Sequence, residues 1–99
     1  MQFDWNDANI QHIARHDVTP EEAEQVIQND PVDVGATLRN KEDRTLHLGE
    51  TNAGRVLFLV ATQRLGLIRV VTARPARRTE RDFYSKHKAA TNDQDPQDS

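Results

Sequence analysis

The chain has 99 residues, a formal net charge of −3 and 35% hydrophobic residues, enough for one domain with a modest core. It contains no cysteine, which excludes a disulfide framework, a zinc knuckle and thiol redox chemistry. No apolar run approaches the roughly 20 residues that a membrane-spanning helix needs, and the first ten residues lack the pattern of a signal peptide, so we expect a soluble, cytoplasmic protein.

Charge is distributed unevenly along the sequence. Residues 1–33 carry eight acidic side chains and one basic, whereas residues 64–88 carry eight basic side chains and two acidic. Six of those eight are arginines, which bind phosphate through paired hydrogen bonds. Local potential rather than net charge attracts a polyanion, so this segment indicates an anionic ligand. A solvated basic surface is the alternative, and the residues alone leave both open.

The first predicted helix follows Asn6 or Asp7, either of which can cap its start. Ile10, Ile13 and Ala14 are spaced at i, i+3 and i+4, which is typical of a short amphipathic helix.

A second helix is predicted over residues 19–29. Thr19 is a favoured N-cap, Pro20 occupies the first helical position, and Glu22 completes a capping box. The apolar stripe consists of Ala23, Val26 and Ile27, and the Asp30–Pro31 pair ends the helix.

Beyond Pro31 the apolar residues recur with a period of two, which predicts strands at residues 32–38, 44–50, 55–63 and 67–73. The third is almost continuously apolar and should be central. A C-terminal helix is predicted to start at Pro75 and to run to residue 88, with Phe83 packed on the sheet. Residues 89–99 should form a disordered acidic tail. We therefore expect a single α+β domain over residues 1–88: two N-terminal helices, a four-stranded antiparallel meander and a C-terminal helix.

Arg69 is the arginine that a solvated surface explains least well. It lies on the strand face opposite Ile68 and Val70, and a strand within a meander seldom carries an exposed arginine without a partner. We therefore interpret Arg69 as a candidate ligand-binding residue.

Histidines give two weaker signals. His12 and His16 are spaced as two metal ligands on a helix would be, but Ile13 stands where a metalloprotease has glutamate, and no third ligand is apparent. His16 is better explained by contacts at the helix end. His47 is a candidate acid or base, because histidine is the residue type most often used for proton transfer near neutral pH, although a lone strand histidine is more often an exposed polar residue. A regular strand directs Arg44 and His47 to different sides.

Three stretches resemble the BrnT family of type II toxins: FDWNDANIQHIARHDVTPEEAEQVI (3–27), GETNAGRVLFLV (49–60) and IRVVTARPARRTERDFY (68–84). The most specific is the closing motif, which falls on Arg69, Thr72, Ala73, Arg74, Ala76, Glu80 and Tyr84. Two residues depart from the family pattern. Asp17 replaces a glycine, which a left-handed turn tolerates. Arg77 replaces the threonine that caps the last helix, so this helix is expected to begin either earlier, at Pro75, or later, at Thr79.

The resemblance implies a RelE-like fold and a small ribonuclease that needs neither a metal nor another cofactor. Such cleavage uses the substrate's 2′-hydroxyl and requires a base, an acid and cations around the phosphate. On this basis Arg69 and Arg74 would stabilise the scissile phosphate, Glu80 or His47 would act as base, and Tyr84 would stack or donate a proton. Glu80 has a structural alternative, as the ion-pair partner of Arg69 or Arg74, which we favour slightly. The expected RNA-binding residues are Arg44, Arg77, Arg78 and Arg81.

The resemblance also implies a partner, a BrnA-type antitoxin with a ribbon-helix-helix fold, in a possible hetero-tetramer. An acidic or dimeric antitoxin should cover the basic segment 64–88. A different class of function stays open, namely a non-catalytic RNA-binding or partner-binding module on the same scaffold.

Overall fold

The computed structural model of the chain describes residues 1–93. Its elements, in chain order, are α1 (Asp7–Ala14), α2 (Pro20–Gln28), β1 (Val32–Arg39), β2 (Glu42–Glu50), β3 (Val56–Arg64), β4 (Leu67–Pro75) and α3 (Arg78–Asp93). The predicted α+β class and order of elements are confirmed.

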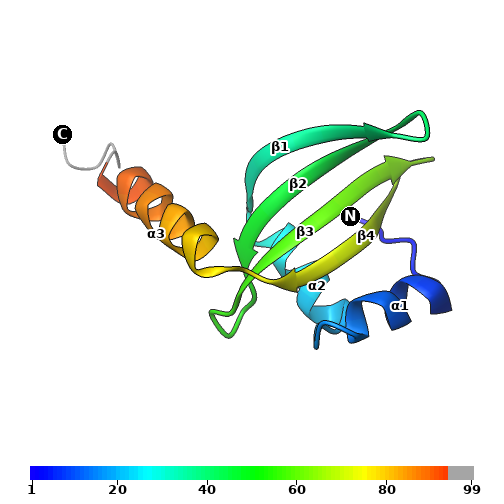
Figure 1. The fold of residues 1–99 in the computed structure, drawn as a ribbon, viewed down its shortest axis with the longest axis horizontal. Helices are drawn as coiled ribbons and strands as arrows, with labels where there is room; N and C mark the ends of the chain where they lie inside the picture. The colour runs from blue at the N-terminus through cyan, green and yellow to red at the C-terminus, as the bar shows by residue number, and fades with distance from the viewer. Residues whose placement is uncertain (94–99) are drawn as a thin grey trace.

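The four strands form one antiparallel sheet in the order β1-β2-β3-β4, so each strand pairs with its neighbour in sequence (Figure 1). This is the predicted meander. Two irregularities interrupt the pairing, one in β1 between Asp33 and Gly35 and one between β3 and β4 at Val60 and Ala61. Bulges of this kind bend a strand and increase its twist.

α1 and α2 cover one face of this sheet (Figure 1). The core between them contains Ile13, Val18, Ala23, Val26, Leu57, Leu59, Val70 and Ala73. Gly49 of β2 lies against α2, where an added Cβ would stand 2.9 Å from side-chain atoms of Val26 and Pro31. Glycine at this position therefore allows the helix and the sheet to approach closely.

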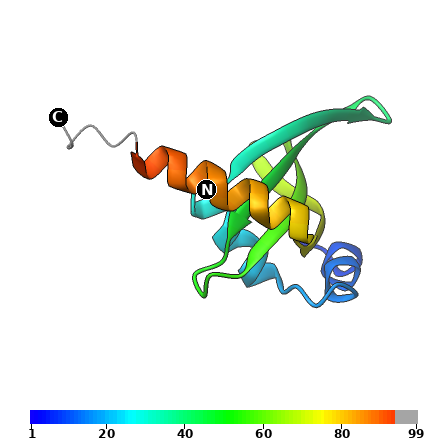
Figure 2. The ribbon, with the colours of Figure 1, turned by 60° about the vertical axis from the view of Figure 1, so that its left-hand side comes forward.

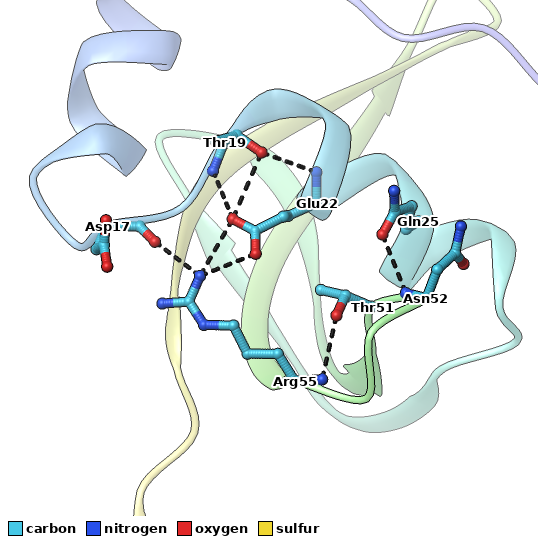
Figure 3. A network of polar contacts seen from close by, with 7 residues as sticks. All are labelled: Asp17, Thr19, Glu22, Gln25, Thr51, Asn52 and Arg55. Atoms are coloured by element: carbon cyan, nitrogen blue, oxygen red, sulfur yellow. Dashed lines mark hydrogen bonds and ion pairs between the residues drawn. The ribbon is translucent and has the colours of Figure 1, made fainter.

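A polar network fixes α2 on the sheet (Figure 3). Thr19 and Glu22 form the predicted capping box, and Asp17 occupies the left-handed conformation expected of it, with φ of 61°. Arg55 Nη1 donates to the backbone oxygen of Asp17 at 2.7 Å and to Glu22 Oε2 at 3.0 Å. The guanidinium of Arg55 thus links the start of α2 to β3, and its role is structural.

α3 leaves the end of β4 and extends away from the strands (Figures 1 and 2). It begins at Arg78, one residue before the later of the two predicted starts, Thr79, and not at Pro75, which is the last residue of β4. It continues to Asp93, past the predicted end at residue 88, while residues 94–99 of the predicted tail lie outside the described residues. Phe83 was predicted to pack on the sheet, and this is wrong, because its side chain is 51% exposed. The direction of α3 leaves Phe83 outside the core.

Across residues 1–93, no helix combines the length and the apolar composition that crossing a bilayer requires.

Candidate nucleic-acid interface

The sheet face opposite α1 and α2 carries the arginines of the strands. Because Gly49 faces α2, the even-numbered residues of β2 point to the other side. Leu48 of β2 pairs with Phe58 of β3, and Phe58 pairs with Arg74 of β4. Residues directly opposite each other point to the same side, so all three side chains lie on this face. We call it the arginine face; it consists of Glu42, Arg44, Leu46, Leu48, Glu50, Phe58, Val60, Arg69 and Arg74.

Arg74 is held at one end of the arginine face by Glu80 of α3. Its Nη1 donates to Glu80 Oε1 at 2.8 Å and its Nη2 donates to Oε2 at 2.9 Å. Its guanidinium carbon also lies 4.3 Å from the centre of the Phe58 ring, a cation–π contact. The hydrogen bond from Arg74 lowers the pKa of Glu80, although partial burial opposes the shift. Glu80 is therefore ionised at neutral pH, and the predicted ion-pair role is confirmed for Arg74.

Glu80 also determines where α3 starts. Its Oε1 accepts a hydrogen bond of 2.7 Å from the backbone N–H of Arg77, the residue before the helix. A carboxylate in this position satisfies an N–H group that has no partner within the helix. One side chain thus caps α3 and orients the guanidinium of Arg74.

A second cluster lies at the other end of the arginine face, around Glu42. Arg69 Nη2 donates to Glu42 Oε2 at 2.5 Å, and Arg44 Nε donates to Glu42 Oε1 at 2.9 Å. The hydrogen bond from Arg44 is the largest cause of a lowered pKa for Glu42, and the charge of Arg69 adds to it. Glu42 is therefore the partner that an arginine at this position of a strand was expected to have.

Glu42 was not among the candidate site residues predicted from the sequence. The predicted strand began at Arg44 and left Glu42 outside it, whereas β2 starts at Glu42. The signal was the spacing of Glu42 and Arg44, which places both side chains on one face once the strand includes them.

The two clusters are separate. Arg69 pairs with Thr62 and Arg74 pairs with Phe58, and these two partners are four positions apart on β3, or about 13 Å at the rise of a strand. Each guanidinium is held by a different carboxylate. A single phosphate group does not span this distance, so the arrangement suits an anion with several phosphates. The apolar side chains of Leu46 and Val60 lie on the same face.

Tyr84 contacts the sheet through Glu50. Its hydroxyl donates to Glu50 Oε1 at 3.1 Å, and Lys88 Nζ lies 2.5 Å from the same oxygen. Burial raises the pKa of Tyr84 to about 12, with a further contribution from the bond to Glu50. Tyr84 is therefore a neutral hydrogen-bond donor at pH 7 and cannot act as a base there.

His47 lies on the opposite side of the sheet from the arginines. It pairs with the buried Leu59 of β3 and with Asp33 of β1. Its Nδ1 is 2.8 Å from Asp33 Oδ1, the distance of an ion pair, but the approach lacks the direction of a good hydrogen bond. Arg44 and His47 do point to different sides, as predicted, and the structure does not bring His47 together with Arg69 or Arg74.

Three more arginines precede or begin α3. Arg81 Nη1 donates to the backbone oxygen of Ala76 at 2.7 Å, which ties it to the junction between β4 and α3. Arg77 and Arg78 are exposed, and within residues 1–90 their guanidinium groups make no ion pair. Of the three, Arg77 and Arg78 are the more available to a phosphate.

His12 and His16 contact each other edge to face, with ring centres 5.9 Å apart. His12 Nε2 is 3.1 Å from Thr72 Oγ1, which links α1 to β4. In the described part of the chain, no group of three or more histidine, cysteine, aspartate or glutamate side chains is arranged to hold a metal ion. The contacts of His12 are those of a structural residue.

Residues 5–80 match a protein-family model, that of the ribonuclease toxin BrnT of type II toxin–antitoxin systems. The match extends from Trp5 to Glu80 and so includes both arginine clusters. No curated protein matches the chain.

Proposed function

The chain belongs to the BrnT family of ribonuclease toxins of type II toxin–antitoxin systems, and on that premise we propose that it inhibits growth by cleaving RNA without a metal ion. The observation that carries this proposal is the arginine face, where two arginine–glutamate clusters flank an apolar strip. Such a face suits a polyanion with stackable bases.

The proposed reaction is attack by the 2′-hydroxyl of RNA on the adjacent phosphate, with loss of the 5′-oxygen of the next nucleotide. Arg74 stabilises the negative charge that develops on that phosphate, and Arg69, in the separate cluster, stabilises the charge of a neighbouring phosphate. A phosphate that binds the guanidinium of Arg74 displaces Glu80, and the freed carboxylate accepts the proton of the 2′-hydroxyl. Tyr84, which is neutral at pH 7, supplies a proton donor for the leaving oxygen. Proton transfer by His47 would require a substrate that reaches the other side of the sheet.

RNA binding outside the reaction centre is assigned to Arg44, Arg77, Arg78 and Arg81. Arg77 and Arg78 meet backbone phosphates directly, whereas Arg44 and Arg81 first give up the contacts with Glu42 and Ala76. An antitoxin of the BrnA type, with a ribbon-helix-helix fold and in a hetero-tetramer, neutralises the toxin by covering the same basic surface.

Expression of the chain in bacteria without an antitoxin tests the proposal. Growth should stop and total RNA should be degraded, whereas Arg74→Ala should abolish both effects. Arg15→Ala is the matched control, because Arg15 is exposed and follows α1 on the helix side. Intact growth and intact RNA, with soluble and folded protein, would exclude the nuclease.

One observation favours the alternative, a non-catalytic RNA-binding or partner-binding module. Each candidate base is either engaged by arginine, as Glu80 is, or lies across the sheet, as His47 does. If the purified chain binds RNA with strong salt dependence and never cleaves it, the binding module is the function.

A further inference from the structure

The two edges of the sheet differ. Residues 2–4 occupy the outer edge of β4, where the Asp4 N–H donates to the Ile68 carbonyl at 2.8 Å and the Ile68 N–H donates to the Gln2 carbonyl at 2.9 Å. Asn9 Nδ2 of α1 donates to the Val70 carbonyl at 3.3 Å on the same strand. The outer edge of β1 has no strand beside it within residues 1–93.

The devices that usually protect an edge strand are confined to the ends of β1, where the bulge and Asp33 lie near its start and Arg39 is its last residue. Seven of its eight residues are exposed, and it contains neither proline nor lysine. Two of its apolar side chains face solvent, Val34 with 36% and Leu38 with 67% of the side chain exposed. The bulge lies near its start, so Gly35–Arg39 remain in regular register with β2. These five residues present a straight, unoccupied edge.

We propose that this edge binds β1 of a second copy of the chain. In an antiparallel pairing centred on Thr37, each Thr37 lies opposite the other, Ala36 lies opposite Leu38, and Gly35 lies opposite Arg39. Threonine pairs and apolar pairs are favourable across strands, and glycine leaves room for the long arginine side chain. Further out, Asp33 approaches Lys41, which brings opposite charges together. No like charges meet in this register, and the exposed Leu38 gains an apolar neighbour.

The pairing joins two four-stranded sheets into one continuous sheet. Two identical antiparallel neighbours are related by a two-fold axis perpendicular to the sheet, so both arginine faces lie on the same side. The dimer therefore presents both arginine faces on one continuous side, with the α1 and α2 helices of both copies on the other side. This inference goes beyond the proposed ribonuclease function and does not depend on it.

The contact is small, so the dimer is reversible, with a dissociation constant on the order of micromolar. Sedimentation velocity of the full-length chain over a range of concentrations measures it. The expected result is a shift from 11.3 kDa toward twice that mass as concentration rises. Hydrogen exchange at the same concentrations should slow at amides of residues 35–39.

Two charge variants at the exposed Thr37 test the register. Thr37→Lys and Thr37→Glu each place like charges opposite one another at the axis, and each should weaken self-association by about fivefold or more. An equimolar mixture should restore association, because the introduced lysine then faces the introduced glutamate. Gln63→Lys is the matched control, at an exposed position near the end of β3, and should dimerise like the original chain.

These measurements distinguish a dimer formed through β1 from a monomer and from a dimer formed elsewhere. A chain that stays at 11.3 kDa at every concentration overturns the proposal. A dimer that Thr37→Lys leaves unchanged, or a mixture that fails to recover, also overturns it, since the interface would then lie elsewhere. Unchanged thermal unfolding of both variants confirms that a loss of dimer is not a loss of fold.

Discussion

At the scale of single residues, the arginine face is organised by glutamates. Glu80 binds Arg74 through both carboxylate oxygens, and Glu42 joins Arg44 to Arg69. A long arginine side chain loses much rotational freedom when it binds a phosphate, and a carboxylate that already fixes the guanidinium reduces that loss. The glutamates also compete with the phosphate, so the same residues orient the arginines and limit their affinity for anions.

Glu80→Gln tests the combined role of Glu80 in positioning Arg74 and in accepting a proton. Glutamine keeps the shape but loses the charge, the paired contact with Arg74 and the proposed base, so we expect RNA cleavage to fall about tenfold or more. The free energy of unfolding should fall by no more than about 1 kcal/mol, since the pair is partly exposed. Cleavage assays and urea unfolding measure the two effects. Glu21→Gln, at an exposed site of α2, is the control and should leave both unchanged.

Stability should also depend on pH through these carboxylates. The pKa values of Glu22, Glu42, Glu50 and Glu80 are all lowered in the fold. A lowered pKa contributes stability above the unfolded-state pKa, near 4.5, and this contribution is lost as pH falls through the folded-state value. The urea midpoint should therefore drop steadily below about pH 4.5, and Glu80→Gln should make the decline shallower. A midpoint that is constant from pH 6 to pH 3 would contradict the assignment.

At the scale of elements, α3 is attached to the sheet mainly by polar contacts. At its first turns Glu80 binds Arg74 and Tyr84 binds Glu50. Phe83 is half exposed and stacks against His87, with ring centres 6.5 Å apart. The core lies on the other face of the sheet. α3 is therefore the element whose attachment is weakest and most sensitive to charge.

Phe83→Ala and Leu59→Ala should consequently differ. Leu59 is fully buried, and its truncation should cost about 2–5 kcal/mol of unfolding free energy through lost burial and a cavity. Phe83 is half exposed, so its truncation should cost less than about 1 kcal/mol. Denaturant unfolding of the two variants measures both. Equal losses would mean that α3 packs its aromatic residue on a core in solution.

Tyr84→Phe isolates the link between α3 and β2. The change removes only the hydroxyl that donates to Glu50, and the lost hydrogen bond should cost roughly 1 kcal/mol. Hydrogen exchange should become faster at amides of α3 near residue 84, with β3 amides unaffected. Uniformly faster exchange throughout the chain would indicate that α3 unfolds together with the sheet.

The elements could be predicted because their signals are local. The capping box at Thr19 and the alternation in β2 depend on neighbours a few residues away. The direction of α3 depends on the pairing between Arg74 and Glu80 and on which part of the sheet surface is free to receive the helix. The spacing of apolar residues contains neither, so it could not predict that Phe83 is exposed. The link from Glu42 to Arg69 joins residues 27 positions apart. No pattern within one strand reveals such a link.

At the scale of the whole molecule, the chain separates its charges. The acidic segment 1–33 contains α1 and α2, which lie on one side of the sheet, and the arginines of β2 and β4 lie on the other. The acidic helix side thus repels polyanions although the net charge of the chain is only −3, while the arginine face is the side on which polyanions meet guanidinium groups. This separation orients RNA, or an acidic partner, before any contact forms.

Salt dependence measures how many arginines meet phosphates. Arg78→Ala should lower the slope of log affinity for single-stranded RNA against log salt by about 0.7, because one phosphate contact is lost. The fold should not change, since Arg78 is exposed and its side chain makes no ion pair within residues 1–90. Arg81→Ala should reduce the slope similarly but also weaken the junction before α3, where Arg81 holds the Ala76 carbonyl. Arg15→Ala should alter neither slope nor stability. If Arg15→Ala reduced the slope as much as Arg78→Ala, RNA would not be confined to the arginine side, and charge separation would not direct binding.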